Sequence, residues 1–176
     1  MKKRILALVL AGVMSTMIVA CGSTSDAPEV DVETTEDTAE DTVELGTPLE
    51  VLDSIYANAE LDADLAEQIA NGAFQQAELD ESLVGMFLGE TEVEYASGAV
   101  SAPSMSSIAY QVVVLQLNEG QDVEAVKTEL VDTADTGKWV CVEPEAVVAV
   151  NNGNYVLFIM ADEATSDALV AAFREL

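Results

Sequence analysis

Two apolar segments joined by a short stretch of asparagine and glycine constrain the fold of this chain more than any other feature. The segments are residues 145–150 and 155–160, with Asn151-Asn152-Gly153-Asn154 between them. Asn-Gly is preferred in the tight turns that join antiparallel strands, because both residues tolerate positive φ. A third segment, residues 108–117 (IAYQVVVLQL), is rich in β-branched residues and predicts a central strand. We therefore expect an antiparallel sheet that contains a β-hairpin.

Helix signals lie before, between and after these strands. Thr47-Pro48-Leu49-Glu50 combines an N-cap, a proline at the first helical position and a capping-box glutamate, and predicts a helix to about Asn58. Four more helices are predicted from a capping residue followed by apolar residues at helical spacing. They run from Asp62 to Asn71-Gly72, from Asp80 or Ser82 to Gly89, onward from Asp122, and from Asp162 to about Leu176.

The remaining segments complete the predicted architecture. Residues 90–95 alternate glutamate with Thr91, Val93 and Tyr95 and predict a half-buried strand, whereas residues 98–106 are small and polar and predict a loop. We expect an α+β fold: a short antiparallel sheet of three to four strands, including the C-terminal hairpin, with helices packed on one face and a helix as the last element. Because the strand segments are almost continuously apolar, either both faces of the central strands are covered, or one face is used for contact.

The N-terminal end has the pattern of an export signal. Lys2, Lys3 and Arg4 precede an apolar run over residues 5–20. That run is shorter than the ~20 apolar residues that a membrane-spanning helix needs. Residues 1–20 therefore predict a signal peptide. The alternative is an N-terminal anchor that is not cleaved.

The run ends in Ile18-Val19-Ala20-Cys21, which resembles the bacterial lipobox. The resemblance implies that the Cys21 thiol is joined to diacylglycerol, and that cleavage makes Cys21 the new N-terminus, which often carries a further fatty acid such as palmitate. Two or more acyl chains hold a protein stably on a membrane. The expected location is the outer face of the cytoplasmic membrane, with lipidation of Cys21 as the anchor. The alternative is an ordinary cleavage site beside an incidental cysteine.

Residues 21–46 form a segment rich in acids, serine and threonine. Nine acids and no base lie between Asp26 and Glu44. A segment with low hydrophobicity and charge of one sign cannot bury enough apolar surface to offset the entropy of ordering. It predicts a disordered spacer, or alternatively an acidic tail that docks on a basic partner. Residues 47–176 are then a single domain.

Composition excludes several classes of function. The chain has 33 acids against 6 bases, a net charge of −27 and no histidine. Nucleic-acid binding needs clustered lysine and arginine, so we expect no nucleic-acid partner. The absence of histidine excludes Ser-His-Asp and Cys-His nucleophiles and His-ligated zinc or haem. With Cys21 lipidated, Cys141 has no partner for a disulfide. Cys141 lies in the apolar segment 139–142, which predicts a short strand or packed loop, and we expect it to be a buried small hydrophobe.

The only site residue that the sequence predicts is Cys21, for lipidation, and no catalytic or metal-binding pattern adds another. Asp62, Asp64 and Glu67 begin like a calcium loop, but Ala66 stands where a third ligand is needed, so a capped helix start is favoured. Glu143 and Glu145 are a carboxylate pair, although their spacing does not show that they face each other across a substrate. The glutamates of residues 90–95 predict a solvated strand face, with weak divalent-cation binding as the alternative. No catalytic residue, cofactor or metal site is predicted.

The order of motifs resembles a family of lipoproteins from Gram-positive bacteria. After the lipobox and the acidic spacer come IAYQVVVLQL, DVEAVKTEL, PEAVVAVNNGNYVLFIMAD and a final helix. The resemblance covers about residues 48–176 and is best over 107–176. It implies the fold and the location. In that family the C-terminal domain has no assigned function, so the resemblance implies no active site.

The functional expectation is a membrane-anchored extracytoplasmic lipoprotein. Its domain is expected to be a binding or interaction module for a protein or envelope ligand that the sequence does not identify. The alternative is an envelope enzyme that depends on carboxylates or a divalent cation. A narrower alternative is a surface protein that buffers cations.

Overall fold

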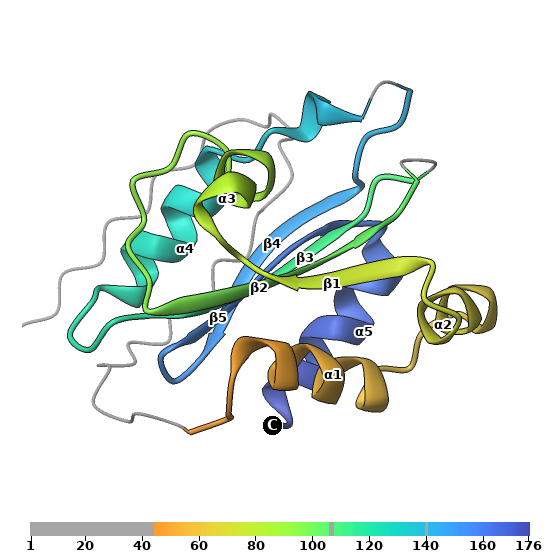
Figure 1. The fold of residues 1–176 in the computed structure, drawn as a ribbon, viewed down its shortest axis with the longest axis horizontal. Coiled ribbons are helices and arrows are strands. Elements are labelled where there is room, and N and C mark those ends of the chain that lie inside the picture. The colour runs from red at the N-terminus through yellow and green to blue at the C-terminus, as the bar shows by residue number, and fades with distance from the viewer. Residues whose placement is uncertain (1–43, 106–107, 140) are drawn as a thin grey trace, which may run out of the picture. The chain divides into compact units, whose positions relative to one another are not determined.

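The structure is a computed structural model that describes residues 44–176, apart from 106–107 and 140. The predicted signal peptide, the lipobox with Cys21 and the predicted spacer up to residue 43 lie outside the described residues. Figure 1 shows the order of elements in the described part: α1 (Pro48–Asn58), α2 (Ala63–Ala70), β1 (Phe74–Glu78), α3 (Glu81–Phe87), β2 (Ser97–Pro103), β3 (Gln111–Gln116), α4 (Val123–Asp132), the short 3-10 helix η1 (Thr136–Lys138), β4 (Ala146–Asn152), β5 (Tyr155–Ala161) and α5 (Glu163–Arg174).

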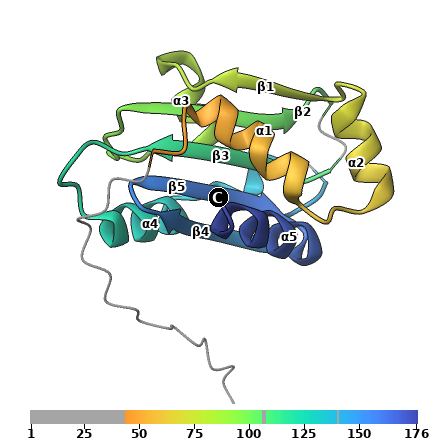
Figure 2. The ribbon, with the colours of Figure 1, turned by 90° about the horizontal axis from the view of Figure 1, so that it is seen from below.

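The strands form one antiparallel sheet with the order β1-β2-β3-β5-β4, which can be followed in Figure 2. β4 and β5 are the predicted hairpin: Asn152 pairs with Tyr155, and Gly153 and Asn154 form the two-residue turn. Gly153 adopts a φ of 57°, which glycine reaches without strain. The predicted central strand is β3, which lies between β2 and β5. The α+β class, the antiparallel sheet and the final helix are confirmed.

The helices begin where their capping residues predict. The Thr47 hydroxyl accepts from Glu50 N at 3.3 Å, and Glu50 Oε2 accepts from Thr47 N at 2.8 Å, which completes the capping box of α1. An aspartate side chain caps each of the other four described α-helices. Each such cap satisfies amides that the first turn leaves without a partner in the helix.

The sheet has five strands rather than the predicted three to four, because two strands carry no apolar pattern. β1 (FQQAE) contains no β-branched residue, and four of its five residues are exposed. β2 (SGAVSAP) lies in the segment predicted as a loop. Its small residues allow close packing: a Cβ on Gly98 would lie 3.0 Å from Leu115 Cδ2 and 3.1 Å from Leu79 Cβ. Backbone pairing and close approach, rather than β propensity, place both strands in the sheet.

The prediction of a strand over residues 90–95 is wrong. The expected alternation of burial is present, since the three glutamates are exposed and the residues between them are half-buried, but the segment is irregular and pairs with no described strand. Instead, Glu129 of α4 holds it. Glu129 Oε1 accepts from Thr91 Oγ1 at 2.6 Å and from Glu92 N at 2.7 Å. The predicted ladder of glutamates on a strand face therefore does not exist.

Helices cover both faces of the sheet, so the expectation of helices on one face is wrong and the expectation of two covered faces is confirmed (Figure 1). α1 and α5 pack on the face that carries Val112 and Val114 of β3. α4 packs on the other face, which carries Val113 and Leu115. Successive residues of a strand point to opposite faces, so a strand covered on both sides is apolar throughout. Full burial of one such side chain is worth about 1.5–3 kcal/mol.

The two apolar clusters contain all of their buried residues between Val51 and Phe173. A chain that lacks residues 1–21 therefore keeps the entire described core.

Candidate functional site

A groove opens at one end of the sheet, where the helices α2 and α5 and the strands β3 and β4 all begin. Its volume is about 510 Å³, within the range of roughly 300–1,000 Å³ that is usual for ligand pockets. The walls come from the start of α2, the segment that leads into β3, the segment that leads into β4, and the first turn of α5. We call this feature the acidic groove. It is lined by Glu60, Leu61, Asp62, Asp64, Leu65, Gln68, Ile108, Ala109, Tyr110, Val142, Glu143, Glu145, Asp162, Ala164 and Thr165.

Among the described residues that line the acidic groove, carboxylates are the only charged groups. All six are exposed: Glu60, Asp62, Asp64, Glu143, Glu145 and Asp162. Two of them have structural roles as helix caps, since Asp62 Oδ1 accepts from Asp64 N at 2.9 Å and Asp162 Oδ1 accepts from Thr165 N at 2.9 Å. The caps explain why acids gather here, because the start of a helix favours an acceptor and a negative charge.

Apolar side chains and a buried tyrosine also line the acidic groove. Leu61, Leu65 and Val142 are half-buried in its wall. Tyr110 is only 2% exposed; its ring packs edge-on against Phe74, with ring centres 4.7 Å apart. A lining of both apolar and charged side chains suits a ligand that has both an apolar and a charged part.

Tyr110 and Tyr56 share a hydrogen bond below the groove, with their hydroxyl oxygens 2.8 Å apart. The pKa of Tyr110 is raised well above its ordinary value, first because burial disfavours the phenolate, then because Tyr56 and Asp162 lie nearby. Burial also raises the pKa of Tyr56. Both side chains therefore stay neutral at physiological pH.

A second hollow of about 560 Å³ lies between the start of α1 and the β1–β2 edge of the sheet. Its wall includes Glu44, the first described residue, so the hollow lies where the chain enters the domain. Tyr155, which also lines it, donates a hydrogen bond of 2.6 Å to Gly46 O. Among the described residues, three acids line this hollow and six line the acidic groove, so the acidic groove is the better candidate for a site that attracts cations.

Lys138 is an unusual group that the sequence did not reveal. Its Nζ donates to Met86 O at 3.0 Å and to the buried Gln111 Oε1, and lies 5.3 Å and 4.8 Å from the ring centres of Phe87 and Trp139. Burial lowers the pKa of Lys138 to about 8, although Asp135 opposes the shift. Most of these partners are far from Lys138 in the sequence, so no local pattern could have identified the site.

The structure places the residues singled out in the sequence as follows. Cys21 lies outside the described residues. Asp62 caps α2, which confirms the capped helix start. Glu143 and Glu145 line the same groove as Asp62 and Asp64, a grouping that the sequence could not show because the two pairs are about 80 residues apart. Among the described residues, no cluster of three or more acids or cysteines is arranged to hold a metal ion.

Cys141 is exposed, so the prediction of a buried small hydrophobe is wrong. The segment after η1 is irregular rather than a strand, and its apolar side chains do not all turn inward. Trp139 is the residue of this segment that enters the core on the α4 face.

No protein-family model, curated protein or solved structure matches this chain. Within the described range, none of the helices is both long enough and apolar enough to cross a bilayer.

Proposed function

We propose that this protein is an extracytoplasmic lipoprotein, held on the outer face of the cytoplasmic membrane through Cys21, whose domain binds a cationic ligand in the acidic groove. The signal-peptide pattern, the lipobox and the acidic spacer support the location. The observation that supports the binding role is the groove itself: its described lining contains six exposed acids, no base and several apolar side chains. The chemistry of its lining defines the class of ligand, an ammonium or guanidinium group joined to an apolar part.

Two forces favour such a ligand. Each carboxylate attracts a cation by about 1 kcal/mol at 4 Å in water and by more where the groove excludes solvent. The apolar part gains about 25 cal/mol for each Å² of apolar surface that it buries on Leu61, Leu65 and their neighbours. The electrostatic part weakens with added salt, because the screening length is about 8 Å at physiological ionic strength.

The groove is tested with simple probes on the chain that lacks residues 1–21. Hexylammonium is titrated in an NMR experiment, with hexanoate as a probe of opposite charge and methylammonium as a probe without the apolar chain. Of the three probes, we expect only hexylammonium to cause saturable changes in NMR chemical shift. These changes should lie in residues 61–65, 108–110 and 142–145. Shifts spread evenly over the acidic surface would contradict a defined site.

A pair of charge-matched variants separates the groove from the overall charge. Changing Asp64 to Asn and both Glu143 and Glu145 to Gln should weaken hexylammonium binding at least about tenfold. Changing Glu90, Glu92 and Glu94 to Gln removes the same charge from exposed positions outside the groove and should leave binding nearly unchanged. Equal weakening by both triple variants would show diffuse attraction rather than a site.

The lipid anchor has its own test. Replacing Cys21 with Ala should abolish incorporation of a labelled fatty acid and release the protein from the membrane fraction, because the thiol that carries the lipid is gone. The Cys141→Ala variant is the matched control and should label like the parent. The anchor proposal fails if the parent takes up no label and the Cys21→Ala variant remains with the membranes.

The grouping of acids also supports an alternative proposal, an envelope enzyme that uses carboxylates. The groove brings Asp62 and Asp64 of the α2 region together with Glu143 and Glu145 in one concave site. Glycoside hydrolysis needs two carboxyl groups on opposite sides of the scissile bond. Incubation with purified envelope glycan should then release fragments detectable by mass spectrometry, and the Asp64, Glu143 and Glu145 amide variant should not release them. Absence of fragments with the parent would remove this alternative.

A further inference from the structure

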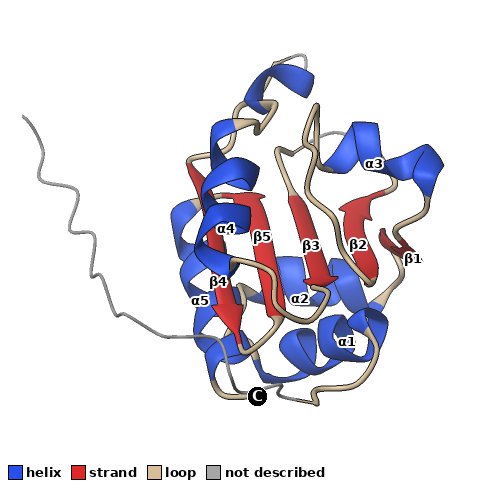
Figure 3. Cartoon of the chain, turned by 90° about the vertical axis from the view of Figure 1, so that its left-hand side faces the viewer, coloured by secondary structure: helices blue, strands red, loops and turns tan. Residues whose placement is uncertain are grey.

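β1 forms an open edge of the sheet. It is the outermost strand in the order β1-β2-β3-β5-β4 and pairs with β2 alone among the described strands (Figure 3). Phe74 is buried on the face that α1 covers, but Gln75, Gln76, Ala77 and Glu78 are all exposed, so little of the described chain covers these four residues. The opposite edge differs, because α4 and α5 pack against β4 from the two faces and leave each of its residues half-buried.

Two hydrogen bonds show which backbone groups of β1 are free to pair. Leu79 N donates to Gly98 O at 2.8 Å, and Ser104 N donates to Ala73 O at 2.9 Å. These bonds lie at the two ends of the β1–β2 pairing, so residues 73, 75, 77 and 79 direct their N–H and C=O groups toward β2. Hydrogen bonding alternates along an antiparallel strand. Phe74, Gln76 and Glu78 therefore direct theirs outward, away from the sheet.

This edge lacks several of the usual protections against pairing, although β1 is short and carries the charged Glu78. Natural edge strands are guarded by lysine, proline, bulges or a covering element. β1 contains no lysine and no proline, and its five residues pair with β2 in an unbroken register. β1 is therefore a regular strand on which an extended segment can pair.

The charge around the edge identifies the kind of segment that fits. Every charged side chain from Glu44 to Glu124 is an acid, and the only bases of the described part are Lys127, Lys138 and Arg174, which lie in α4, η1 and α5. Glu78 lies on β1, and Asp80 and Glu81 follow it two and three residues later. A second copy of this chain would bring acid against acid, whereas a basic segment would meet opposite charge.

We propose that the edge of β1 docks an extended, basic segment of a partner protein, which adds to the sheet as a sixth strand. The backbone groups of Phe74, Gln76 and Glu78 supply the hydrogen bonds, as in other cases of strand addition. Alternate lysine or arginine side chains of the partner lie near Glu78, Asp80 and Glu81. This docking site is separate from the acidic groove, so either can fail without the other.

The test uses the full chain, isolated from membranes in a neutral detergent. The probe is a short fluorescent peptide of alternating lysine and valine, and affinity is measured by anisotropy. A matched peptide is N-methylated at every residue, which removes the backbone N–H donors of both its edges but keeps the charge. We expect the first peptide to bind and to slow hydrogen exchange in β1, and the N-methylated peptide to bind at least about tenfold more weakly.

Two variants test the same edge from the side of the protein. Gln76→Pro removes the central outward N–H and leaves the bonds to β2, because an edge strand tolerates proline where its N–H faces solvent. Gln76→Thr keeps the N–H and is the control. We expect Gln76→Pro to lose binding and Gln76→Thr to keep it. The N-methylated peptide needs no variant, so the test holds even if Gln76→Pro folds poorly.

Three results would overturn the proposal. Equal binding of both peptides would show that charge alone attracts them. Slowed exchange in residues 61–65 and 142–145 without slowed exchange in β1 would assign the peptide to the acidic groove, which would favour the proposed function over this inference. A dimer of the parent that Gln76→Pro dissociates would assign the edge to a second copy of the chain.

Discussion

Lys138 shows how a single cation is accommodated in a very acidic chain without an ion pair. Carbonyl oxygens of Met86 and Gln111 and the rings of Phe87 and Trp139 surround its ammonium group. In the described part of the chain, the only ion pair within 4 Å is that of Lys127 with Glu124, a neighbour on α4. Lys138 therefore links the end of α3 and η1 to β3. Its position is determined by packing rather than by charge pairing.

The lowered pKa of Lys138 predicts a pH dependence of stability. Its pKa is about 8 in the folded protein and 10.5 ordinarily. Between these values the unfolded chain binds the extra proton, so the free energy of unfolding gains a contribution that rises with pH. Lys138→Arg stays charged throughout. We expect the difference in unfolding free energy, parent minus Lys138→Arg, to increase from pH 8 to 10 in urea titrations.

A flat difference over that range would contradict the lowered pKa. The comparison with the arginine variant is needed because Tyr56, Tyr95 and Tyr110 act in the opposite direction. Burial raises the pKa of each, so the folded state retains their protons, and stability falls once the unfolded tyrosines ionise above about pH 10. Both proteins share this loss, and it cancels in the difference.

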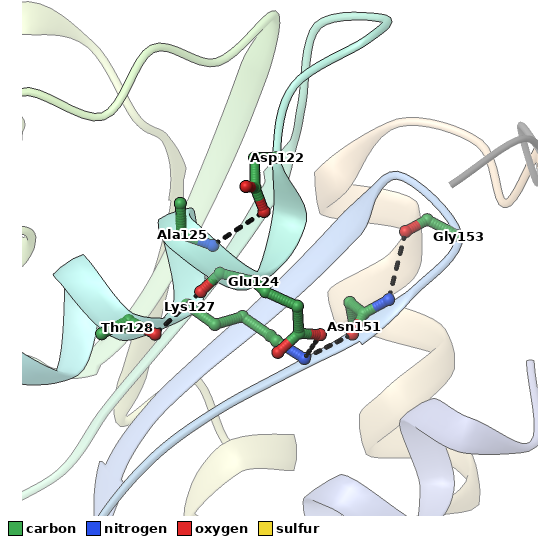
Figure 4. A network of polar contacts seen from close by, with 7 residues as sticks. All are labelled: Asp122, Glu124, Ala125, Lys127, Thr128, Asn151 and Gly153. Carbon is green, nitrogen blue, oxygen red and sulfur yellow. Dashed lines mark hydrogen bonds and ion pairs between the residues drawn. The ribbon is translucent and has the colours of Figure 1, made fainter. Parts of the chain in front are cut away.

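Another polar network, which Figure 4 shows, connects α4 to the hairpin of β4 and β5. Lys127 Nζ lies 2.5 Å from Glu124 Oε1 and donates to Asn151 Oδ1 at 2.8 Å, while Asn151 Nδ2 donates to Gly153 O at 3.4 Å. Asn151 thus joins the turn of the hairpin to the helix that covers it. Glu124 is mostly exposed, and an exposed pair of this kind contributes about 0.3–0.5 kcal/mol. The network orients the hairpin more than it stabilises it.

At the scale of elements, β2 depends on close approach rather than on side-chain size. Gly98 is buried between Leu79 and Leu115, and Ala99 and Val100 are buried on opposite faces of the sheet. Because its side chains are small, β2 packs closely against α1 on one face of the sheet and against Leu79 on the other. A larger residue at Gly98 would have to displace one of two leucine side chains.

A pair of glycine variants tests this reasoning. Gly98→Val should lower the free energy of unfolding by about 1–3 kcal/mol, because extra atoms in a packed site force side chains off their rotamers. Gly85→Ala in α3 is the control. A Cβ there meets nothing within 4 Å, so this variant should raise stability by about 0.5–1 kcal/mol. Urea unfolding of both variants decides, and an unchanged midpoint for Gly98→Val would refute the close packing of β2.

At the scale of the whole molecule, charge is the dominant feature. The chain carries 33 acids against 6 bases, and Lys2, Lys3 and Arg4 are half of those bases. Like charges on one surface repel and favour expansion, which opposes the compact state. The two apolar clusters on the faces of the sheet must therefore outweigh this repulsion as well as the conformational entropy.

Screening should relieve the repulsion. For the chain that lacks residues 1–21, we expect the melting temperature to rise when sodium chloride increases from about 0.02 M to about 0.5 M, because the screening length shortens to a few ångströms. The variant with Gln at positions 90, 92 and 94 should show a smaller rise, since fewer charges repel. A melting temperature that is independent of salt in the parent would contradict this account.

Elements with strong local signals were predictable. The hairpin of β4 and β5, the strand β3 and the caps Thr47, Asp62, Asp122 and Asp162 all follow from residues that lie next to one another in the sequence. The sequence does not indicate β1 and β2, because backbone pairing holds them in the sheet. It indicates a strand over residues 90–95 because glutamates alternate there with less polar residues, although no described strand pairs with this segment. The side of the sheet that each helix covers was not predictable either.

The candidate site shows the same division. Asp62, Glu143 and Glu145 each belong to a recognisable pattern in the sequence, but nothing local indicates that they share one groove. No local pattern marks Lys138, because Met86, Phe87 and Gln111 reach it from distant segments. Grouping of this kind depends on how the helices pack on the sheet, which involves long-range contacts.

The sequence by itself determined where helices begin, where the hairpin turns, and that this chain is strongly acidic with an N-terminal export pattern, because short-range sterics, capping and charge act between near neighbours. Only the tertiary structure decided that both faces of the sheet are covered, that β1 is an open edge, that Cys141 is exposed and that six carboxylates line one groove. These features arise from burial of apolar surface between distant segments, and the strength of that burial depends on the whole chain.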